Sequence, residues 1–288
     1  MIECINSILN TKAKIDTEII VVDNNSSDDT VSVISELFPE IRIIENTENK
    51  GYSGAVNQGA KLAKGEYLII SNADIVFQEN TIYNLIDKLK KDDTIGIISP
   101  QQTFENGDYQ RSYGYYPSIK RGIYDLFLIS KITLLLRNRD FSNQNYKQIK
   151  VEYLDGALLC TTKHLFDELG GFDEDFFFYS EEVDFCYRVN KSGLKCILST
   201  SETVIHHRGG SQENKGMNKK SIEMLINSEI RFIRKYQSEI SVAIYLRLEY
   251  LFFLLILVYN KITEKKDKLE NNKKYLKIIK KAWNEVKL

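Results

Sequence analysis

The sequence predicts an α/β fold with a mainly parallel sheet flanked by helices, followed by a helical C-terminal extension. Short apolar runs alternate with segments of helical periodicity from residue 19 to residue 98. Strands that alternate with helices form βαβ units, which build parallel sheets covered on both faces. After Ser211 the pattern is helical alone. We therefore expect one domain at residues 1–211 and C-terminal helices at 212–288.

The expected elements follow one another in a regular order. A polar cluster after the first strand offers Ser27 or Asp28 as a helix N-cap, and Gly65 follows a later helix as its stop. The expected strands cover residues 19–22, 41–44, 67–70, 96–98, 151–162, 195–200 and 203–207. The expected helices cover about 27–38, 53–63, 79–91, 122–139, 163–171, 180–193, 217–236, 240–260 and 265–286.

Composition and charge exclude several classes of protein. The 288 residues carry a net charge of −1, which gives no reason to expect a nucleic-acid partner. Four scattered cysteines lack the spacing of a zinc site and suit a reducing compartment. The N-terminus does not resemble a signal peptide, and the longest apolar run, Tyr250–Tyr259, is shorter than the roughly 20 residues that span a bilayer. We therefore expect a cytoplasmic protein.

Two acidic residues follow separate strands of the predicted sheet. Asp23 ends one apolar run, and Asp74 follows another within the motif Asn72-Ala73-Asp74. Ligands of open α/β sheets bind outside the carboxyl ends of the strands. A carboxylate there can hold Mg²⁺ or Mn²⁺, which share oxygen ligands with substrate phosphates. The alternative, which the motif taken alone favours, is an ordinary turn after a strand.

Three acids lie at the start of a predicted helix whose N-cap is Ser180. Burial and mutual repulsion of Glu181, Glu182 and Asp184 would raise a carboxyl pKa toward that of a general base. The alternative is that these acids only complement the helix dipole. The preceding segment, residues 172–179 (FDEDFFFY), is rich in aromatic side chains and suits a cleft with an apolar wall.

Two further segments have polar residues that could bind a ligand. His206 and His207 end a short strand, where a neutral imidazole can complete a metal site. The alternative is that the two histidines have a structural role only. Residues 49–54 (NKGYSG) combine glycines with a helix start, which is a generic anion site. They match neither the Walker nor the GxGxxG pattern, so this segment is weak evidence for phosphate binding.

Six segments in order carry a resemblance to a known family. They are residues 19–30 (IIVVDNNSSDDT), 49–60 (NKGYSGAVNQGA), 65–77 (GEYLIISNADIVF), 154–193 (from LDGALLCTT to YRVNKSG), 204–211 (VIHHRGGS) and 227–236 (NSEIRFIRKY). This order resembles the inverting family-two glycosyltransferases, especially their bacterial rhamnosyltransferase-like branch. The resemblance covers roughly residues 1–236 and implies a GT-A fold, with a Rossmann-like, mainly parallel sheet flanked by helices.

The resemblance also implies catalytic and metal-binding roles. Glu182 matches the usual catalytic base, and Glu181 and Asp184 belong to the same acidic motif. Asp74 matches the last residue of the DxD-type motif that binds Mg²⁺ or Mn²⁺, and His206 matches the family's histidine at that site. A shift of the match by one residue would put the neighbouring histidine in that role.

The family's nucleotide-binding segments match seven residues of this chain. They are Asp23, Asn25, Asn49, Gly51, Asn57, Asn72 and Asp74. Asn72 stands at the first position of the DxD-type motif, so the chain departs from the family there and one carboxylate must suffice.

The implied reaction moves a sugar from a nucleoside-diphosphate sugar to an acceptor hydroxyl, with inversion at the anomeric carbon. The implied donor is a rhamnose or other hexose, as in dTDP-rhamnose or a UDP-sugar. The implied acceptor is a surface polysaccharide, either free or on a lipid carrier. The alternative is a non-catalytic nucleotide-sugar-binding or assembly subunit, or an inactive, truncated remnant.

The C-terminal helices have features that bear on membrane association. Residues 245–259 (YLRLEYLFFLLILVY) are apolar almost all round, and a lysine-rich segment follows. This combination suits an interfacial element at the inner face of the cell membrane. The alternative is burial of these helices against the domain, a partner subunit or a second copy in a homo-oligomer.

One expectation concerns the N-terminal strand of the family. Relatives begin with a strand, and a helix that residues 1–9 (MIECINSIL) match comes after it. That strand is central in the fold, so we expect a sheet without it to carry unpaired backbone at an exposed edge. Activity of this chain would then depend on what fills the gap.

Overall fold

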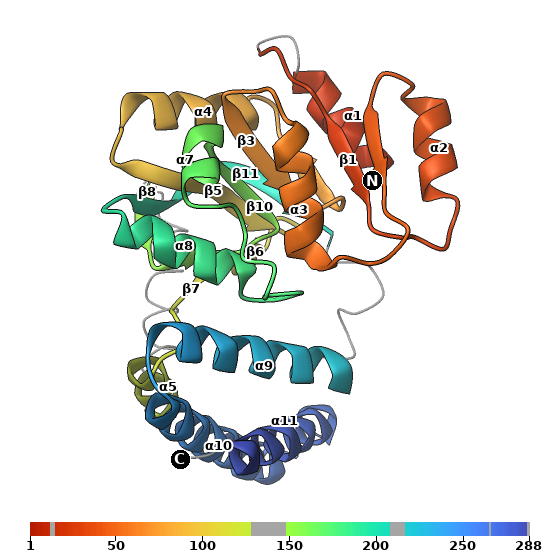
Figure 1. The fold of residues 1–288 in the computed structure, drawn as a ribbon. Coiled ribbons are helices and arrows are strands. Elements are labelled where there is room, and N and C mark those ends of the chain that lie inside the picture. The colour runs from red at the N-terminus through yellow and green to blue at the C-terminus, as the bar shows by residue number, and fades with distance from the viewer. Residues whose placement is uncertain (12–14, 128–147, 208–216, 265, 287–288) are drawn as a thin grey trace. The chain divides into compact units, whose positions relative to one another are not determined.

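The computed structural model describes residues 1–11, 15–127, 148–207, 217–264 and 266–286, and Figure 1 labels its elements where there is room. The chain divides into two compact units. The first comprises Met1–Gly114 and Tyr146–Arg208, and the second comprises the described parts of Tyr115–Asn145 and Gly209–Leu288. The division after Arg208 lies near the predicted boundary at residue 211, but the segment from Tyr115 belongs with the C-terminal helices.

The first unit is built on a seven-stranded sheet. Five strands run side by side in the order β3 (Tyr67–Ser71), β10 (Leu158–Thr162), β5 (Ile95–Thr103), β11 (Lys195–His206) and β4 (Ile75–Phe77). β6 (Tyr109–Gln110) pairs with β5, and β8 (Gln148–Val151) pairs with β11. The two strands predicted at 195–200 and 203–207 form the single strand β11, whose register with β5 shifts between Ser199 and Thr203.

Strand directions in this sheet are mixed rather than mainly parallel. β10 runs antiparallel to both β3 and β5, and β11 runs parallel to β5. The strands β3, β5 and β11 therefore share one direction, as the βαβ pattern predicts, and β10 enters between β3 and β5 from the opposite end. The α/β class is confirmed, and the insertion of β10 accounts for the difference in direction.

Helices cover both faces of the sheet. α4 (Thr81–Lys91) packs on one face, where Ile82, Leu85, Ile86 and Leu89 join apolar side chains of the strands in one core. α7 (Lys163–Glu168) and α8 (Glu181–Lys191) lie against β10, β5 and β11. This cover on two faces explains why four consecutive residues of β10 are buried, where a strand covered on one face would bury alternate residues.

A small separate sheet is formed by β1 (Ile20–Asp23) and β2 (Arg42–Glu45), which pair in parallel. α1 (Ile2–Thr11), predicted as a helix, and α2 (Thr30–Leu37) contribute Ile5 and Ile34 to a core beside it. α3 (Gly51–Leu62) follows β2 and contacts β1. Among the described strands, β1 pairs with β2 alone. β7 (Tyr113–Gly114) and β9 (Tyr153–Leu154) form another pair.

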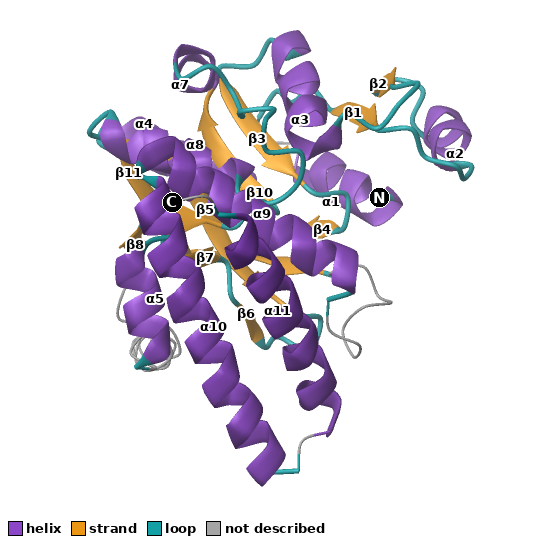
Figure 2. Cartoon of the chain, turned by 60° about the horizontal axis from the view of Figure 1, so that its bottom comes forward, coloured by secondary structure: helices purple, strands orange, loops and turns teal. Residues whose placement is uncertain are grey.

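The second unit is helical. It contains α5 (Ile119–Leu126), α9 (Lys219–Tyr236), α10 (Glu239–Ile262) and α11 (Lys266–Glu285), which confirms the three predicted C-terminal helices. Figure 2 shows α10 and α11 side by side. The core of α9, α10 and α11 includes Ile233, Tyr245 and Ile279. Most of the helix predicted at 122–139 lies outside the described residues.

α10 is long and apolar enough to cross a membrane by length and composition. It has 24 residues, a mean hydropathy of 2.0 in its best window and only 28% of that window buried. The expectation from the uninterrupted run Tyr250–Tyr259, that this segment is too short to span a bilayer, is wrong for the helix as a whole. The helix continues through Arg247 and Glu249, and these two charged residues interrupt its apolar sequence.

Candidate functional site

The strand directions bring several polar segments to one edge of the large sheet. Asn72 and Asp74 follow β3, and Asp155 and Gly156 precede the antiparallel strand β10. The Asn72 N–H donates to the carbonyl oxygen of Ala157 at 2.8 Å, which ties the two segments together. An antiparallel neighbour thus places the start of one strand beside the carboxyl end of another.

His206 and Asp74 lie together at this edge. His206 ends β11, opposite Ile75 in β4, and its Nε2 is 3.4 Å from Asp74 Oδ1. His207 points elsewhere, with its Nδ1 2.7 Å from Glu105 Oε1 and its Nε2 3.2 Å from Glu3 Oε2. Of the two histidines, His206 is therefore the one beside the predicted metal-binding carboxylate.

A pair of buried glutamines surrounds His206. His206 Nδ1 is 2.8 Å from Gln102 Oε1, and Gln110 Nε2 donates to the carbonyl oxygen of His206 at 2.6 Å. Both glutamines and the histidine are buried, on β5, β6 and β11. If Gln102 Oε1 accepts from Nδ1–H, Nε2 keeps a lone pair directed at Asp74. Nothing in the sequence singled out Gln102, because the contact depends on strand pairing.

Asp74 and His206 fit a divalent cation as a pair of ligands. The Asp74 side chain is 34% exposed, so substrate oxygens can reach it. Carboxylate oxygens suit Mg²⁺ and Mn²⁺, and a neutral imidazole nitrogen is the commonest protein ligand of metals in general. Within the described ranges, no group of three or more His, Cys, Asp or Glu residues could hold a metal. The other coordination positions would therefore fall to diphosphate oxygens and water.

Glu181, Glu182 and Asp155 form what we call the acidic cluster. Burial raises the pKa of Glu181 to about 7, and the charge of Asp155 adds to this effect. Burial also raises the pKa of Glu182 well above its ordinary value, with contributions from Glu181 and Asp155. The Oε2 atom of each glutamate is buried and has no hydrogen-bond partner in the described structure. Asp155 was not selected from the sequence, although Asp-Gly before a strand is a visible turn signal.

The backbone that presents the acidic cluster is strained. Tyr179 and Ser180 immediately precede α8 and have φ angles of 71° and 68°. The left-handed conformation costs a non-glycine residue about 1 kcal/mol or more, and such strain gathers at functional sites. Ser180 is the N-cap residue, as predicted, but its side chain makes no capping hydrogen bond.

Asp184 is separate from the acidic cluster in its contacts. It is fully buried, and its Oδ2 accepts from Arg188 Nε at 2.8 Å. Arg188 in turn donates to the carbonyl oxygens of Leu169 and Gly171, at 2.5 and 2.8 Å. The Asp184 carboxylate thus forms an ion pair that anchors the turn after α7, and its expected catalytic role stays a prediction.

Tyr52 links the acidic cluster to Asp74. Its hydroxyl donates to the carbonyl oxygen of Gly156 at 2.8 Å. Gly156 lies against Glu182, because a Cβ built there would come within 3.4 Å of the Glu182 Cβ. Burial raises the pKa of Tyr52, and the charges of the acidic cluster and of Asp74 raise it further. Tyr52 is a residue that sequence reasoning missed, although it lies inside the motif NKGYSG.

The residues expected at the nucleotide base gather after β1. Asp23 is buried, and its Oδ2 accepts from the Ser26 N–H at 3.0 Å. Asn24 Nδ2 donates to Asn49 Oδ1 at 3.0 Å and to the carbonyl oxygen of Gly51 at 2.9 Å. The structure thus joins the loop after β1 to the start of α3, and Asn24 is the link.

Asn25 and Asn57 differ in exposure. Asn25 is exposed and left-handed, with φ at 68°. Asn57 is engaged by the aromatic segment: its Nδ2 donates to the Phe172 carbonyl at 2.8 Å, and its Oδ1 accepts from the Phe172 N–H at 2.9 Å. The hydrogen bonds of Asn57 therefore link α3 to the 172–174 segment. Asn25 is exposed, so a ligand can reach it.

The family model described as "Glycosyl transferase family 2" matches residues 1–160. That is more than half of the 288-residue chain. The chain belongs to glycosyl transferase family 2. The match includes β1, α3, Asp74 and Asp155, so much of the site just described lies inside the matched region.

Named glycosyltransferases are among the relatives of this family-2 chain. N-acetylglucosaminyl-diphospho-decaprenol L-rhamnosyltransferase of Mycobacterium tuberculosis is 26% identical over 211 residues, which are 67% of each chain. Low-salt glycan biosynthesis hexosyltransferase Agl10 of Haloferax volcanii is 25% identical over 206 residues, 66% of this chain and 59% of that protein. The chain is therefore a transferase with rhamnosyltransferase-like relatives.

Two solved structures share the fold. The mannosyltransferase PcManGT from Pyrobaculum calidifontis, in complex with GDP-Man and Mn²⁺, superposes with a TM-score of 0.56 at 16% identity, over 99% of this chain and 84% of that one. GalNAc-T7 with UDP, GalNAc and Mn²⁺ gives a TM-score of 0.54 at 18% identity, over 81% of this chain and 47% of that one. These similarities confirm the GT-A fold.

Proposed function

We propose that this family-2 glycosyltransferase moves a rhamnose or other hexose from a nucleoside-diphosphate sugar to a hydroxyl of a cell-surface glycan acceptor, with inversion. Glu182 is the general base. The carboxyl groups of Glu182 and Glu181 are both enclosed, and Glu182 is preferred as the base because it stands at the position that matches the family's usual base. A raised carboxyl pKa in an enclosed site strengthens the base at neutral pH.

The proposed step conserves atoms and charge. Glu182 takes the proton of the acceptor hydroxyl, and the acceptor oxygen forms a bond to the anomeric carbon as the bond to the nucleoside diphosphate breaks. Asp74 and His206 would hold Mg²⁺ or Mn²⁺, which when bound neutralises charge on the diphosphate. Asn25, Asn49 and the other polar residues of the loop after β1 and the start of α3 would hold the nucleotide.

One observation carries this proposal: a short chain of contacts connects the metal-binding side to the base. Asn72 N–H bonds to Ala157 O at 2.8 Å, and Tyr52 OH bonds to the adjacent Gly156 O at 2.8 Å. Gly156 lies beside Glu182, since a Cβ added at Gly156 would be 3.4 Å from the Glu182 Cβ. A displacement needs its base on one side of the anomeric carbon and its charge-stabilising groups on the other. Convergence of both groups at one sheet edge supports that reaction over simple binding.

The choice of sugar and acceptor is supported by the relatives. The Mycobacterium tuberculosis relative is named for L-rhamnose and for an acceptor on diphospho-decaprenol. We propose a nucleoside-diphosphate rhamnose or hexose as donor for the present chain. A glycan on a lipid diphosphate is the proposed acceptor.

The test is direct detection of transfer by the purified full chain. With Mn²⁺ present, we expect release of nucleoside diphosphate from one member of a panel of dTDP-, UDP- and GDP-sugars. Proton NMR of the product should show the anomeric configuration opposite to that of the donor. Retained configuration would contradict the inverting mechanism.

A non-catalytic role is the second candidate, and Asn72 favours it. Where the family has a first metal-binding acid, this chain has an amide, and the described site offers two metal ligands rather than three. Donor binding without turnover, across the whole panel and with acceptor present, would support this candidate over the enzyme.

We also propose that the helical unit binds the cytoplasmic face of the membrane. Exposed apolar side chains repeat on one face of α10 at helical spacing; they are Leu251, Leu254, Leu255, Val258, Tyr259 and Ile262. Exposed lysines lie on the neighbouring helix α11, among them Lys273, Lys277 and Lys281. An apolar stripe beside basic residues suits a surface of anionic lipid.

Vesicle flotation tests the membrane proposal. The full chain should float with vesicles containing phosphatidylglycerol and less with purely zwitterionic ones, because the lysines add an electrostatic contribution. Leu255→Glu should reduce flotation about tenfold, whereas Leu37→Glu, at a similarly exposed leucine on α2, should not. Equal behaviour of the two variants would overturn the proposal.

A further inference from the structure

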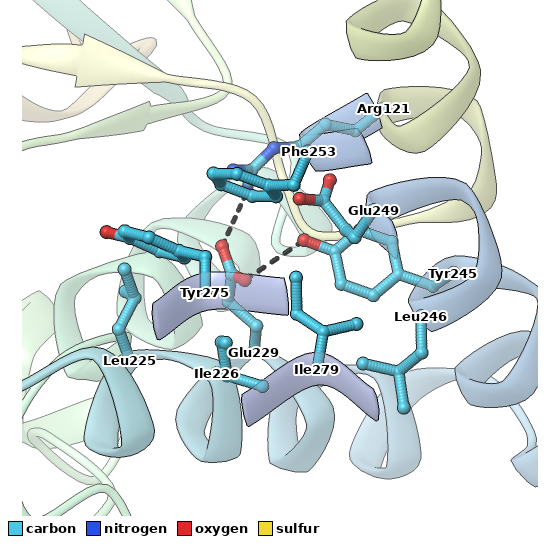
Figure 3. A pocket seen from close by; sticks show the side chains of 10 residues that line it. All are labelled: Arg121, Leu225, Ile226, Glu229, Tyr245, Leu246, Glu249, Phe253, Tyr275 and Ile279. Carbon is cyan, nitrogen blue, oxygen red and sulfur yellow. Dashed lines mark hydrogen bonds and ion pairs between the residues drawn. The ribbon is translucent and has the colours of Figure 1, made fainter. Parts of the chain in front are cut away.

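A cavity of about 170 Å³ lies within the helical unit, between α5, α9, α10 and α11 (Figure 3). Its wall combines aromatic and aliphatic side chains with the ionisable groups of Arg121, Glu229 and Glu249. A cavity of roughly 150 Å³ is large enough to hold benzene. The space therefore suits a ligand of a few carbon atoms. The glycosyltransferase reaction does not use these residues.

Glu229 is fully partnered in this wall. Arg121 Nη1 donates to Glu229 Oε1 at 2.8 Å, and the Tyr245 hydroxyl donates to Glu229 Oε2 at 3.0 Å, as the dashed lines in Figure 3 mark. Arg121 Nε also lies 3.3 Å from Asp125 Oδ2. The one cation of the described wall is thus shared by two carboxylates other than Glu249.

Glu249 is different, because one of its oxygens is left over. The residue is 8% exposed, and its Oε1 has no hydrogen-bond partner in the described structure. A buried polar atom without a partner costs about 1–3 kcal/mol. Burial raises the pKa of Glu249 to about 8; Glu229 and Asp125 raise it further, whereas Arg121 and Tyr245 lower it. The groups around Glu249 therefore supply no hydrogen-bond donor to its Oε1 atom and too little positive charge to stabilise its carboxylate form.

The remaining wall suits a cation that carries carbon atoms. Phe253 stacks on Tyr275 with ring centroids 4.5 Å apart and planes 8° apart, and Leu246 and Ile279 add aliphatic surface. Aromatic faces attract ammonium groups, by about 2 kcal/mol where the site is desolvated. A neutral ligand would make the apolar contacts but would not supply the positive charge that balances a carboxylate at Glu249.

We propose that this cavity binds a small organic ammonium ion. The N–H groups of the ligand donate to Glu249, and its carbon chain contacts the aromatic and aliphatic wall. When the ammonium binds near neutral pH, Glu249 gives up its proton to the buffer, so the ligand cation balances the new carboxylate. Binding is a property of the helical unit and is independent of the glycosyl-transfer proposal.

The test uses n-butylammonium and n-butanol, a charged and a neutral probe of similar shape, with the full chain. The melting temperature of the wild type should rise saturably with n-butylammonium and much less with n-butanol. Glu249→Gln, which keeps the shape and removes the charge, should abolish the response. Glu285→Gln, at an exposed glutamate of α11, should retain it. Equal responses to the two probes, or an unchanged response in Glu249→Gln, would overturn the proposal.

Calorimetry supplies a second readout that needs no variant. At pH 7 in two buffers with different heats of ionisation, the apparent binding heats of n-butylammonium should differ. The difference should correspond to release of about one proton per ligand, because the pKa of Glu249 falls when the cation binds. Identical heats in the two buffers would contradict the proposed contact even if Glu249→Gln did not fold.

Discussion

Whether His206 can bind a cation depends on which of its ring nitrogens carries the proton. The contact of Nδ1 with Gln102 Oε1, at 2.8 Å, favours the form in which Nε2 has the free lone pair beside Asp74. Such outer partners orient metal-binding histidines and raise their basicity. Gln102 thus acts through His206 and is a positioning residue.

Gln102→Leu should weaken binding of Mn²⁺ about 10- to 100-fold in the presence of a nucleoside diphosphate, because the imidazole loses its fixed tautomer. Electron paramagnetic resonance of free Mn²⁺ measures this affinity without turnover. Gln101→Leu, at the preceding position of β5, is the matched control and should bind normally. Normal Mn²⁺ affinity in Gln102→Leu would remove the positioning role.

Asp74→Ala should weaken binding of the nucleotide-sugar donor only when metal is present. The reason is that the carboxylate acts on the diphosphate through the cation rather than directly. Calorimetric titration of donor with Mn²⁺ and with EDTA separates the two cases, and Asp87→Ala on α4 serves as the control. An equal loss of affinity in EDTA would argue against a metal role for Asp74.

At the scale of elements, α3 begins where the aromatic segment docks. Gly51 has φ at 75°, and a Cβ there would overlap the Phe177 carbonyl oxygen. The neighbouring Tyr52 N–H donates to the same oxygen at 2.9 Å. Close approach and a left-handed backbone both require glycine at this position.

Gly51→Ala should therefore destabilise the chain by about 3 kcal/mol or more, because strain and overlap add. Gly107→Ala is the control: its φ is 83°, but no atom lies within 4 Å of the added Cβ. That variant should lose only about 1 kcal/mol, from backbone strain alone. Chemical denaturation of the two variants measures the difference, and similar losses would mean that the Phe177 contact is unimportant.

Local sequence patterns predicted the helices and strands better than they predicted which strands pair and in which direction. Helix α8 and the strands β1 and β3 follow from apolar periodicity and caps within each segment. Glu182 and Asp74 became candidates because they begin or follow such segments and match the family's motifs. Gln102 could not be found, because its role depends on the pairing of β5 with β11, which is a long-range choice. The direction of β10 was missed for the same reason.

The whole chain carries two units with separate cores, and one of them contains the only tryptophan, Trp283. Fluorescence of Trp283 therefore reports on the helical unit. In that unit the pKa of Glu249 is raised from 4.5 to about 8, so the folded state binds more protons than the unfolded state between these values. Its stability should fall as the pH rises from about 4.5 to about 8.

Glu249→Gln should flatten this dependence, because the amide has no proton to lose. Unfolding by urea, followed through Trp283 at several pH values, gives the comparison with the wild type. A steep fall that persists in the variant would assign the pH dependence to other groups.

Sugar transfer with Glu182 as base is the central claim, and one measurement addresses it most directly. Turnover of the donor sugar and affinity for the donor are measured together, with Mn²⁺ and acceptor, for the wild type, Glu182→Gln and the exposed-surface control Glu168→Gln. We expect Glu182→Gln to lower kcat by about 10²- to 10⁴-fold with donor affinity nearly unchanged, and Glu168→Gln to leave both unchanged. Turnover by Glu182→Gln at the wild-type rate would contradict the claim.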